Sequence, residues 1–452
     1  MIKKNRVVIT GLGVVSPLGF GIADTFDGLV EKRCGIARIA AFDASRFSAR
    51  IAAEVRTGDV KDCVPKSYRK ATKVMARDIE LAVMAAYCAV KDAGLKTKCI
   101  VERGEAEGGG VDVDSTRFGA NIGAGLICAD LTELAGTLAM SADRPDAAEN
   151  RGFSFKKWGA EGMANLTPLW LLKFLPNMLA CHVTIVHDCQ APSNTITCGE
   201  ASSHLAIGEA FRTIERGAAD ICICGGAESK INPMGLIRQS LLGRLATDSN
   251  DRPAAACRPF DKTRAGMVIS EGGGLLILEE LERARRRGAR IYAEMCGFGA
   301  AVNASHWFKP QPDGRGLSLA ISKALADAGV KPEEVGLVNA FGVGTQVHDA
   351  SEAAGIRAAL GRNGATAPVL ATKGALGNNG AGSGAIDLAV TVMALHRGVI
   401  PPALNTKDVD PACGLRVVCG DPADARVNVA LSVASALSGG QTAAIVIRRY
   451  QG

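Results

Sequence analysis

The sequence predicts an α/β protein built from two similar halves, with β-sheets layered between helices. Strand-like apolar runs alternate with helical segments along the chain, which is typical of parallel βαβ units. The same order of local motifs occurs twice. Glycine is frequent (53 of 452 residues), and aromatic residues make up only 4% of the chain. Small-residue packing and tight turns fit an α/β architecture better than a β-sandwich.

The first pair of matching elements is a strand followed by a tight turn. It reads VVITGLG at residues 7–13 and AEMCGFG at residues 293–299. A matching pair of helices follows, ending in AVKDAGL at residues 89–95 and in ALADAGV at residues 324–330. In both helices a glycine comes after the last turn, where a left-handed C-cap conformation costs little.

Each of these helices leads to a strand with a glycine-rich loop. The first is FGANIGAG from Phe118, and the second is VNAFGVGT from Val338. Each half then closes on a strand with glycines, ICICGGAES at residues 221–229 and VNVALSVASALSGG at residues 427–440. The order of these pairs indicates a duplicated α/β protein rather than a series of unrelated βα units.

The repeat divides the chain into two predicted domains, residues 1–285 and residues 286–452. Two stretches lie outside the repeated pattern. Residues 100–115 are charged and glycine-rich, and we interpret them as a surface insertion. Residues 141–168 form a long excursion before a helix, and loops of that length commonly cover a site or contact a partner.

Charge and cysteine content exclude several classes of protein. The net charge of +6 is spread along the chain without an aromatic-interleaved basic stretch or zinc-finger spacing, so nucleic acid is not an expected partner. The 14 cysteines are irregularly spaced and form no CxxC pair, which favours free thiols in a reducing compartment. The chain opens on a strand rather than a signal peptide, and no apolar run is long enough to span a bilayer. We therefore expect a cytoplasmic protein.

Six blocks of sequence, in order along the chain, resemble those of one enzyme family. The most specific is RPFDKTRAGMVISEGGGLLILEE at residues 258–280. The others are RVVITGLGVVSPLG (6–19), GGAES (225–229), VNAFGVGT (338–345), ATKGALGNNGAGSGA (371–385) and PPALN (401–405). Over nearly its whole length the chain resembles the β-ketoacyl-[acyl-carrier-protein] synthases, the type II ketosynthases of the thiolase superfamily. The resemblance implies a thiolase-like fold and a place in fatty acid or polyketide biosynthesis.

The chemistry of that family uses one cysteine and two histidines. The cysteine lies on a strand-to-helix elbow and takes the acyl chain from a carrier protein, because the helix N-terminus and nearby amides favour the thiolate and the oxyanion. The histidines hold the malonyl thioester and assist its decarboxylation, which gives the carbanion that attacks the acyl-cysteine. The resemblance implies no metal and no cofactor of the chain's own, since the phosphopantetheine arm arrives with the carrier.

All three catalytic positions are altered in this chain. In the elbow NTITCGEASS (194–203) the nucleophile position falls on Glu200, and the two histidine positions fall on Phe341 and Asn378. Phenylalanine can neither donate a hydrogen bond nor carry a proton, and asparagine cannot titrate. Lys373 matches the active-site lysine of the family. The glutamate also has an ordinary explanation, because a carboxylate there stabilises the dipole and first-turn amides of the helix that follows.

Three interpretations remain open. The altered positions fit best a non-elongating homologue, similar to the chain-length-factor subunits that pair with an active synthase and shape its acyl tunnel. A second interpretation is a decarboxylase in which Glu200 acts as a base beside Asn378. A third is a 3-oxoacyl synthase that uses Cys198 as its nucleophile. The third needs a two-residue shift, which turns a side chain by about 200° on a helix, and it leaves the second histidine missing.

The resemblance also implies protein partners. Thiolase-fold proteins dimerise through the sheet edge near the elbow, so we expect a homodimer or a heterodimer with an active ketosynthase. Acyl carrier proteins are acidic, and Lys66, Arg69 and Lys70 fall where the family places its basic contact patch. A solvated helix face would explain these three residues equally well.

Overall fold

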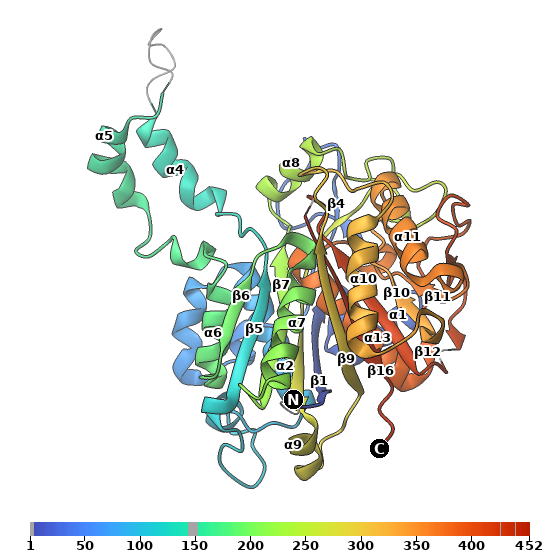
Figure 1. Ribbon diagram of the computed structural model, residues 1–452. Coiled ribbons are helices and arrows are strands. Elements are labelled where there is room, and N and C mark those ends of the chain that lie inside the picture. Colours follow the sequence, from blue (N-terminus) through green and yellow to red (C-terminus); the bar gives the residue numbers. More distant parts are fainter. Residues whose placement is uncertain (1–3, 143–151, 425, 439) are drawn as a thin grey trace.

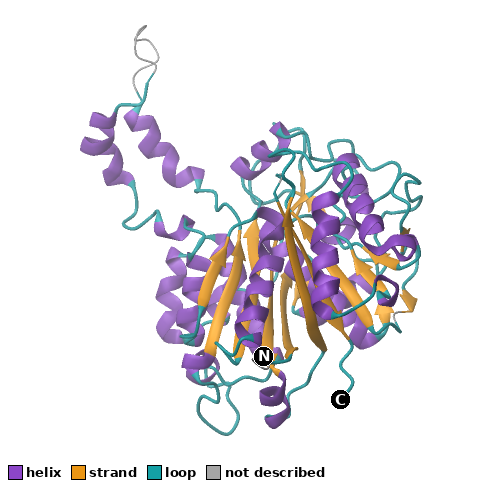
Figure 2. Ribbon diagram, viewed as in Figure 1, coloured by secondary structure: helices purple, strands orange, loops and turns teal. Residues whose placement is uncertain are grey.

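The computed structural model describes residues 4–142, 152–424, 426–438 and 440–452. Its centre is one mixed β-sheet with the strand order β13-β11-β10-β15-β16-β9-β1-β8-β7-β5-β6. Figures 1 and 2 show helices packed on both sides of these strands. The halves of the sheet meet in the middle, where the first strand of one half pairs with the first strand of the other.

The two halves of the sheet have the same topology. The first half contains β1 (Val7–Ser16), β8 (Ile269–Glu280), β7 (Ile221–Ser229), β5 (Phe118–Ala124) and β6 (Ser193–Ile196). The second contains β9 (Ala293–Val302), β16 (Gln441–Arg448), β15 (Val429–Ser435), β10 (Leu337–Asn339) and β11 (Pro368–Leu370), with β13 (Arg416–Val417) at its edge. The predicted duplicated α/β architecture is confirmed, although the division at residue 285 stays a prediction.

The pairing directions differ from the parallel units that the sequence predicts. In each half the outer pairs are parallel, β5 with β7 and β6, and β10 with β15 and β11. The inner pairs are antiparallel, because the last strand of each half, β8 or β16, returns between the first strand and the parallel ones. Three short strands attach to this sheet beside its main path: β2 (Gly19–Phe20), β3 (Ile36–Arg38) and β4 (Ile51–Ala53). A separate two-stranded sheet is formed by β12 (Val399–Ile400) and β14 (Ala423–Asp424).

Helices form layers around the two halves. In the middle, α7 (Ser202–Glu215) and α13 (Ser383–Arg397) pack against each other and against strands of both halves. The outer layers are α2 (Arg77–Asp92) and α6 (Met178–His187) on the first half, and α10 (Arg315–Ala328) and α11 (Gln346–Leu360) on the second. The smaller helices are α1 (Ile22–Val30), α3 (Lys98–Glu102), α8 (Pro233–Leu241), α9 (Leu281–Arg286) and α12 (Lys373–Leu376).

The glycines of the repeated motifs explain why the sequences of the two halves are similar at the same positions. A Cβ atom at Gly13 would lie 2.0 Å from a backbone oxygen of α2, and one at Gly299 would lie 2.1 Å from a backbone oxygen of α10. Each outer helix therefore packs directly on its strand only because the strand carries glycine there. Gly94 and Gly329, after the same two helices, have φ values of 65° and 61°, so the predicted left-handed caps are confirmed.

The two stretches outside the repeat both lie on the surface. Residues 107–112 of the predicted insertion are all exposed. The excursion predicted at residues 141–168 begins at the last residue of α4 (Leu131–Ser141) and includes α5 (Phe155–Lys157), and the short helical turns that follow α5 continue beyond it to Phe174. Residues 143–151 of the excursion lie outside the described residues. Figure 1 shows α4 and α5 projecting away from the body, and we name residues 131–142 and 152–174 the arm.

Two kinds of site are absent from the described part of the chain. No helix there is long and apolar enough to cross a membrane. No three His, Cys, Asp or Glu side chains there gather as they would around a metal ion. All 14 cysteines are free thiols.

Candidate active site

The elbow connects β6 to α7 through one tight turn. Gly199 has a φ of 56° and begins the turn Gly199–Ala201, which carries Glu200 into the interior two residues before α7 begins at Ser202. The Glu200 side chain is 4% exposed. The sequence-predicted nucleophile position therefore points into the protein, towards the loop that follows β15 in the other half of the chain.

Three groups from distant parts of the chain hold the Glu200 carboxylate. The Lys230 Nζ atom lies 3.6 Å from Oε1, and the Asn378 amide donates to the same oxygen at 3.4 Å. The Leu437 backbone N–H donates to Oε2 at 3.0 Å. The sequence-based explanation of this glutamate, an interaction with amides at the start of the helix, is incomplete. The backbone N–H of Glu200 itself acts on the carboxylate, but so does the Leu437 N–H, which belongs to a loop 237 residues away.

The environment keeps Glu200 ionised. Burial alone would raise the pKa of the carboxyl group, but the Lys230 ammonium, the Leu437 N–H and the more distant Arg244 guanidinium outweigh it. The pKa of Glu200 is therefore held below its ordinary value. A carboxyl group with a lowered pKa is a weak base at neutral pH.

Glu200→Gln is expected to lower the free energy of unfolding at pH 7 by about 1–3 kcal/mol, because a bond to a charged group is lost while Lys230 keeps its other partner. The lowered pKa means that Glu200 contributes stability above its ordinary pKa and loses it as the pH falls. The difference between wild type and variant should therefore be constant above about pH 5.5 and should shrink as the pH falls through the ordinary glutamate pKa and then through the lowered pKa of Glu200. Urea unfolding at each pH measures it. Exposed Glu333 supplies the control, Glu333→Gln; a pH-independent difference would contradict the assignment.

Lys230 is a site residue that the sequence analysis missed. It comes directly after β7, is 5% exposed, and donates a hydrogen bond to Glu228 Oε1 at 3.0 Å. Burial lowers the pKa of Lys230, but Glu228 and Glu200 together raise it above its ordinary value. The sequence offered only a weak signal, a lysine directly after a strand that is apolar up to Glu228, and this signal does not identify the buried partners that such a charge needs.

Phe341 contacts Glu352 through its backbone and a buried ion pair through its ring. Its backbone N–H donates to Glu352 Oε1 at 2.5 Å, which fixes the loop after β10. Its ring centre is 4.5 Å from Lys373 Nζ, so the ammonium faces the ring. Lys373 is paired with Asp387, and both are 1% exposed. The structure thus brings two of the predicted site residues, Phe341 and Lys373, into contact.

Asn378 links the elbow to the loop before α13. Its amide nitrogen faces Glu200, and its side-chain oxygen accepts from the Gly380 N–H at 2.9 Å and from Ser383 Oγ at 3.2 Å. Its backbone N–H donates to Val268 O, directly before β8, and its carbonyl oxygen accepts from Ser270 N within β8. Both ends of this side chain are therefore held, and Asn378 presents an amide, not a proton carrier, to Glu200.

Cys198 lies two residues before Glu200 and is partly exposed. Burial raises the pKa of its thiol, and among the described residues no charged group offsets this effect. Its backbone N–H donates to Ser202 Oγ at 2.8 Å, but no described group forms a hydrogen bond with its sulfur. The thiol has the properties of an unactivated cysteine.

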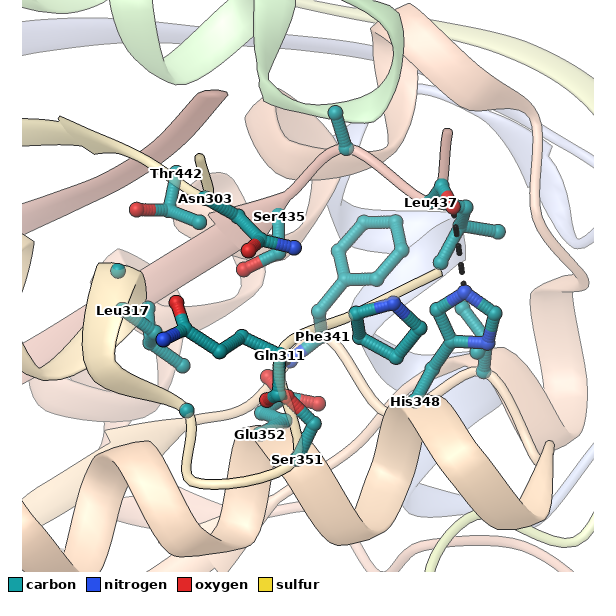
Figure 3. Close-up of a pocket in the computed structure, with 15 residues that line it drawn as sticks. Asn303, Gln311, Leu317, Phe341, His348, Ser351, Glu352, Ser435, Leu437 and Thr442 are labelled. Atoms are coloured by element: carbon teal, nitrogen blue, oxygen red, sulfur yellow. Dashed lines mark hydrogen bonds between the residues drawn. The ribbon is translucent and has the colours of Figure 1, made fainter. Parts of the chain in front are cut away.

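A second buried cation holds the loop above Glu200. Arg244 donates to the Leu437 carbonyl oxygen at 2.6 Å and to the Phe308 carbonyl oxygen at 2.9 Å. His348 Nε2 lies 3.2 Å from the same Leu437 oxygen, as the dashed line in Figure 3 marks. Both backbone polar groups of Leu437 are thus paired, its N–H with Glu200 and its carbonyl oxygen with Arg244 and His348.

Little space remains beside Phe341. Figure 3 shows the pocket between Phe341, His348 and Leu437 on one side and Gln311 and Leu317 on the other. Its cavity volume is about 40 Å³, whereas sites for drug-sized ligands have volumes of about 300–1,000 Å³. A larger cavity of about 660 Å³ lies at the base of the arm, lined by residues of α4, α8 and the start of α2.

The predicted carrier-contact residues lie apart from this cluster. Lys66, Arg69 and Lys70 are exposed on the helical turn Lys66–Val74. Arg69 is 3.8 Å from Asp62, and none of the three contacts Glu200 or its partners. A role in binding a carrier protein stays a prediction.

Two family profiles cover most of the chain. The profile "Beta-ketoacyl synthase, N-terminal domain" matches residues 4–284, and "Beta-ketoacyl synthase, C-terminal domain" matches residues 292–407. The chain belongs to the β-ketoacyl synthase family. The resemblance read from the motifs is confirmed at the level of the family and of the thiolase-like ketosynthase fold. The equivalence of Glu200, Phe341 and Asn378 to the cysteine and histidines stays a prediction.

Relatives of this ketosynthase-family chain come from both fatty acid and polyketide biosynthesis. It is 36% identical to 3-oxoacyl-[acyl-carrier-protein] synthase 2 of Synechocystis sp., over all of this chain and 99% of the relative. It is 33% identical to the tetracenomycin polyketide synthase ketoacyl synthase alpha subunit of Streptomyces glaucescens, over 98% of this chain and 97% of the relative.

Solved structures of similar chains include assemblies with partners. One is the ishigamide ketosynthase/chain length factor, with 28% identity and a TM-score of 0.82 over 99% of this chain and 100% of that chain. Another is AntDE:AntF, a type II PKS acyl-carrier protein in complex with its ketosynthase bound to the hexaketide, with 27% identity and a TM-score of 0.81 over the same shares.

Proposed function

We propose that this chain is a non-elongating subunit of a type II fatty acid or polyketide synthase, which pairs with an active ketosynthase in the manner of a chain-length factor. The observation that carries the proposal is the ionised glutamate at the nucleophile position predicted for the elbow. Glu200 is ionised and held by Lys230, Leu437 and Asn378. A carboxylate fixed in this way cannot form the acyl thioester from which chain extension starts.

The two other altered positions support the same conclusion. Decarboxylative condensation needs groups that donate hydrogen bonds to the malonyl thioester as charge develops on it. The Phe341 ring has no such donor, and the Asn378 amide is directed at Glu200. The small cavity beside Phe341 also leaves little room for a malonyl group on this side.

The surface supports a partner subunit. β6 is the last strand of the sheet, and two of its four residues are exposed. The neighbouring arm exposes large apolar side chains, among them Phe155 (82%), Met163 (55%) and Leu171 (53%). Exposed sheet edges and apolar patches are typical of surfaces that a partner covers. A second ketosynthase-fold subunit, either another copy or an active homologue, fits both features.

The decarboxylase interpretation has weaker support. Its base would be Glu200, whose pKa is lowered rather than raised towards neutrality. An ionised carboxylate at this position would also repel the carboxylate of an incoming malonyl group. The interpretation that uses Cys198 is weak for a different reason, since its thiol pKa is raised and no described base contacts the sulfur.

Incubation with acyl-loaded carrier protein is expected to leave the intact mass of this chain unchanged. The intact Synechocystis synthase, treated in parallel, should gain one acyl group. Peptide mapping then covers the elbow of both proteins. A thioester on Cys198 would overturn the proposal in favour of a synthase with a displaced nucleophile.

The same sample with malonyl-loaded carrier protein tests the decarboxylase. We expect no release of carbon dioxide beyond that from the carrier alone. Release that disappears in Glu200→Gln would assign catalysis to Glu200 and contradict the non-elongating role.

A further inference from the structure

Lys230 lies at the centre of a buried chain of charges that joins three loops. Its ammonium lies between Glu228 (3.0 Å) and Glu200 (3.6 Å). The far oxygen of each carboxylate accepts a backbone N–H, from Ala381 at 2.7 Å for Glu228 and from Leu437 at 3.0 Å for Glu200. One lysine therefore connects the end of β7, the elbow, the loop before α13 and the loop after β15.

Such an arrangement needs a specific reason to exist. Removing a charged group from water costs several kcal/mol per ion unless partners compensate it. All three charged side chains here are 5% exposed or less. Each carboxylate has the ammonium on one side and an amide on the other, which compensates the burial.

We propose that Lys230 and the Leu437 amide form an anion-binding hole at the elbow, and that the chain fills this hole with its own Glu200 carboxylate. Lys230 is a positioning residue in this account, because it acts on whatever stands at position 200. The hole would equally hold a thiolate or a small free carboxylate if Glu200 were absent. This inference does not depend on a partner subunit. The anion-binding hole can therefore be disproved while the proposed function stands, and the proposed function can be disproved while the hole stands.

Arg244 and the start of α7 favour an anion in the hole, His348 is neutral, and Glu228 is the one opposing charge among the groups named here. Arg244 acts on Glu200 as a second, more distant cation. His348 shares the Leu437 carbonyl with Arg244, and burial and Arg244 lower the pKa of His348 to about 4, so it is neutral at pH 7. Glu228 is the opposing carboxylate, and Lys230 shields position 200 from it. The start of α7 adds the partial positive charge of a helix N-terminus.

The first test places a thiol in the hole. In Glu200→Cys we expect the introduced thiol to titrate at least one pH unit below its midpoint in Glu200→Cys/Lys230→Met, which is a tenfold change in the ionisation constant. Glu200→Cys/Lys230→Arg, which keeps the cation, should restore most of the lowering. The ultraviolet absorbance of the thiolate, with wild type subtracted, follows the titration without needing a reagent to enter the site.

Native Cys198 is the internal reference, because it lies two residues away and has a raised pKa. Equal midpoints for the introduced thiol with and without Lys230 would overturn the proposal. A midpoint in Glu200→Cys as high as that of an ordinary thiol would do the same.

The second test empties the hole and keeps Lys230 in place. Sodium formate is expected to raise the thermal unfolding midpoint of Glu200→Ala more than sodium chloride at equal ionic strength. Wild type, whose hole is full, should show no difference between the two salts. No specific effect of formate on Glu200→Ala would overturn the proposal, and this arm needs no substitution of Lys230.

Discussion

Replacing Lys373 by methionine is expected to lower the free energy of unfolding by about 3–5 kcal/mol. Lys373 is paired with Asp387, both are 1% exposed, and Lys373 also donates to Thr372 Oγ1 at 3.3 Å. Methionine fills a similar volume but leaves Asp387 buried without its cation. Burial already raises the pKa of Asp387 against the opposing effect of Lys373, so the remaining carboxylate would be strongly disfavoured.

Denaturant unfolding at pH 7 measures the loss, and Lys407→Met, at an exposed position, provides the matched control. Removing both charges in Lys373→Met/Asp387→Leu should recover part of the stability, because no unpaired ion then remains. A loss below about 1 kcal/mol in the single variant would show that the pair adds little.

The ion pair with Asp387 indicates a structural role for Lys373, which the sequence motif places among the catalytic residues. The sequence assigns Lys373 to a catalytic block by its position alone. In the structure its ammonium serves Asp387 and faces the Phe341 ring. The lysine therefore packs against the apolar side chain at the predicted histidine position. Its ammonium is paired with Asp387 and Thr372, not with Glu200 or Asn378.

The fold was largely predictable because its signals are local. Glycines at fixed places in strand and helix motifs mark the close packing of α2 on β1 and of α10 on β9. The antiparallel return of β8 and β16 was not predictable in this way. Strand direction depends on where a strand lies in the sheet, and the apolar runs of β8 and β16 read the same in either direction.

The candidate site was predictable only in part. The motifs located Glu200, Phe341, Asn378 and Lys373, because each stands inside a recognisable block. Lys230 and Leu437 contact Glu200 from other parts of the chain, and Arg244 contacts the Leu437 carbonyl. The lysine after β7 is a weak local signal, but no local pattern shows which side chain or backbone amide it will meet. The ionisation of Glu200 depends on these long-range contacts, so it could not be deduced from the elbow sequence.

The combined variant Phe155→Ser/Leu171→Ser is expected to weaken subunit pairing by about 100-fold. The two side chains are 82% and 53% exposed on the arm, so their loss should change the stability of the free chain by no more than about 0.5 kcal/mol. Truncating two apolar anchors in an interface costs about 3 kcal/mol together, which corresponds to that change in affinity. Sedimentation velocity over a concentration series measures pairing, for the chain alone and mixed with an intact ketosynthase from the same organism.

The control must remove equally exposed apolar groups far from the arm. Leu319 on α10 and Val302 at the end of β9 are 48% and 57% exposed, and four strands of the sheet lie between β9 and β6, the edge strand near the arm. Leu319→Ser/Val302→Ser should pair like wild type. If the arm variant also pairs like wild type, the arm is not the docking surface. If pairing falls only in the mixture with the intact ketosynthase, the arm selects a heterologous partner, as a chain-length-factor-like subunit requires.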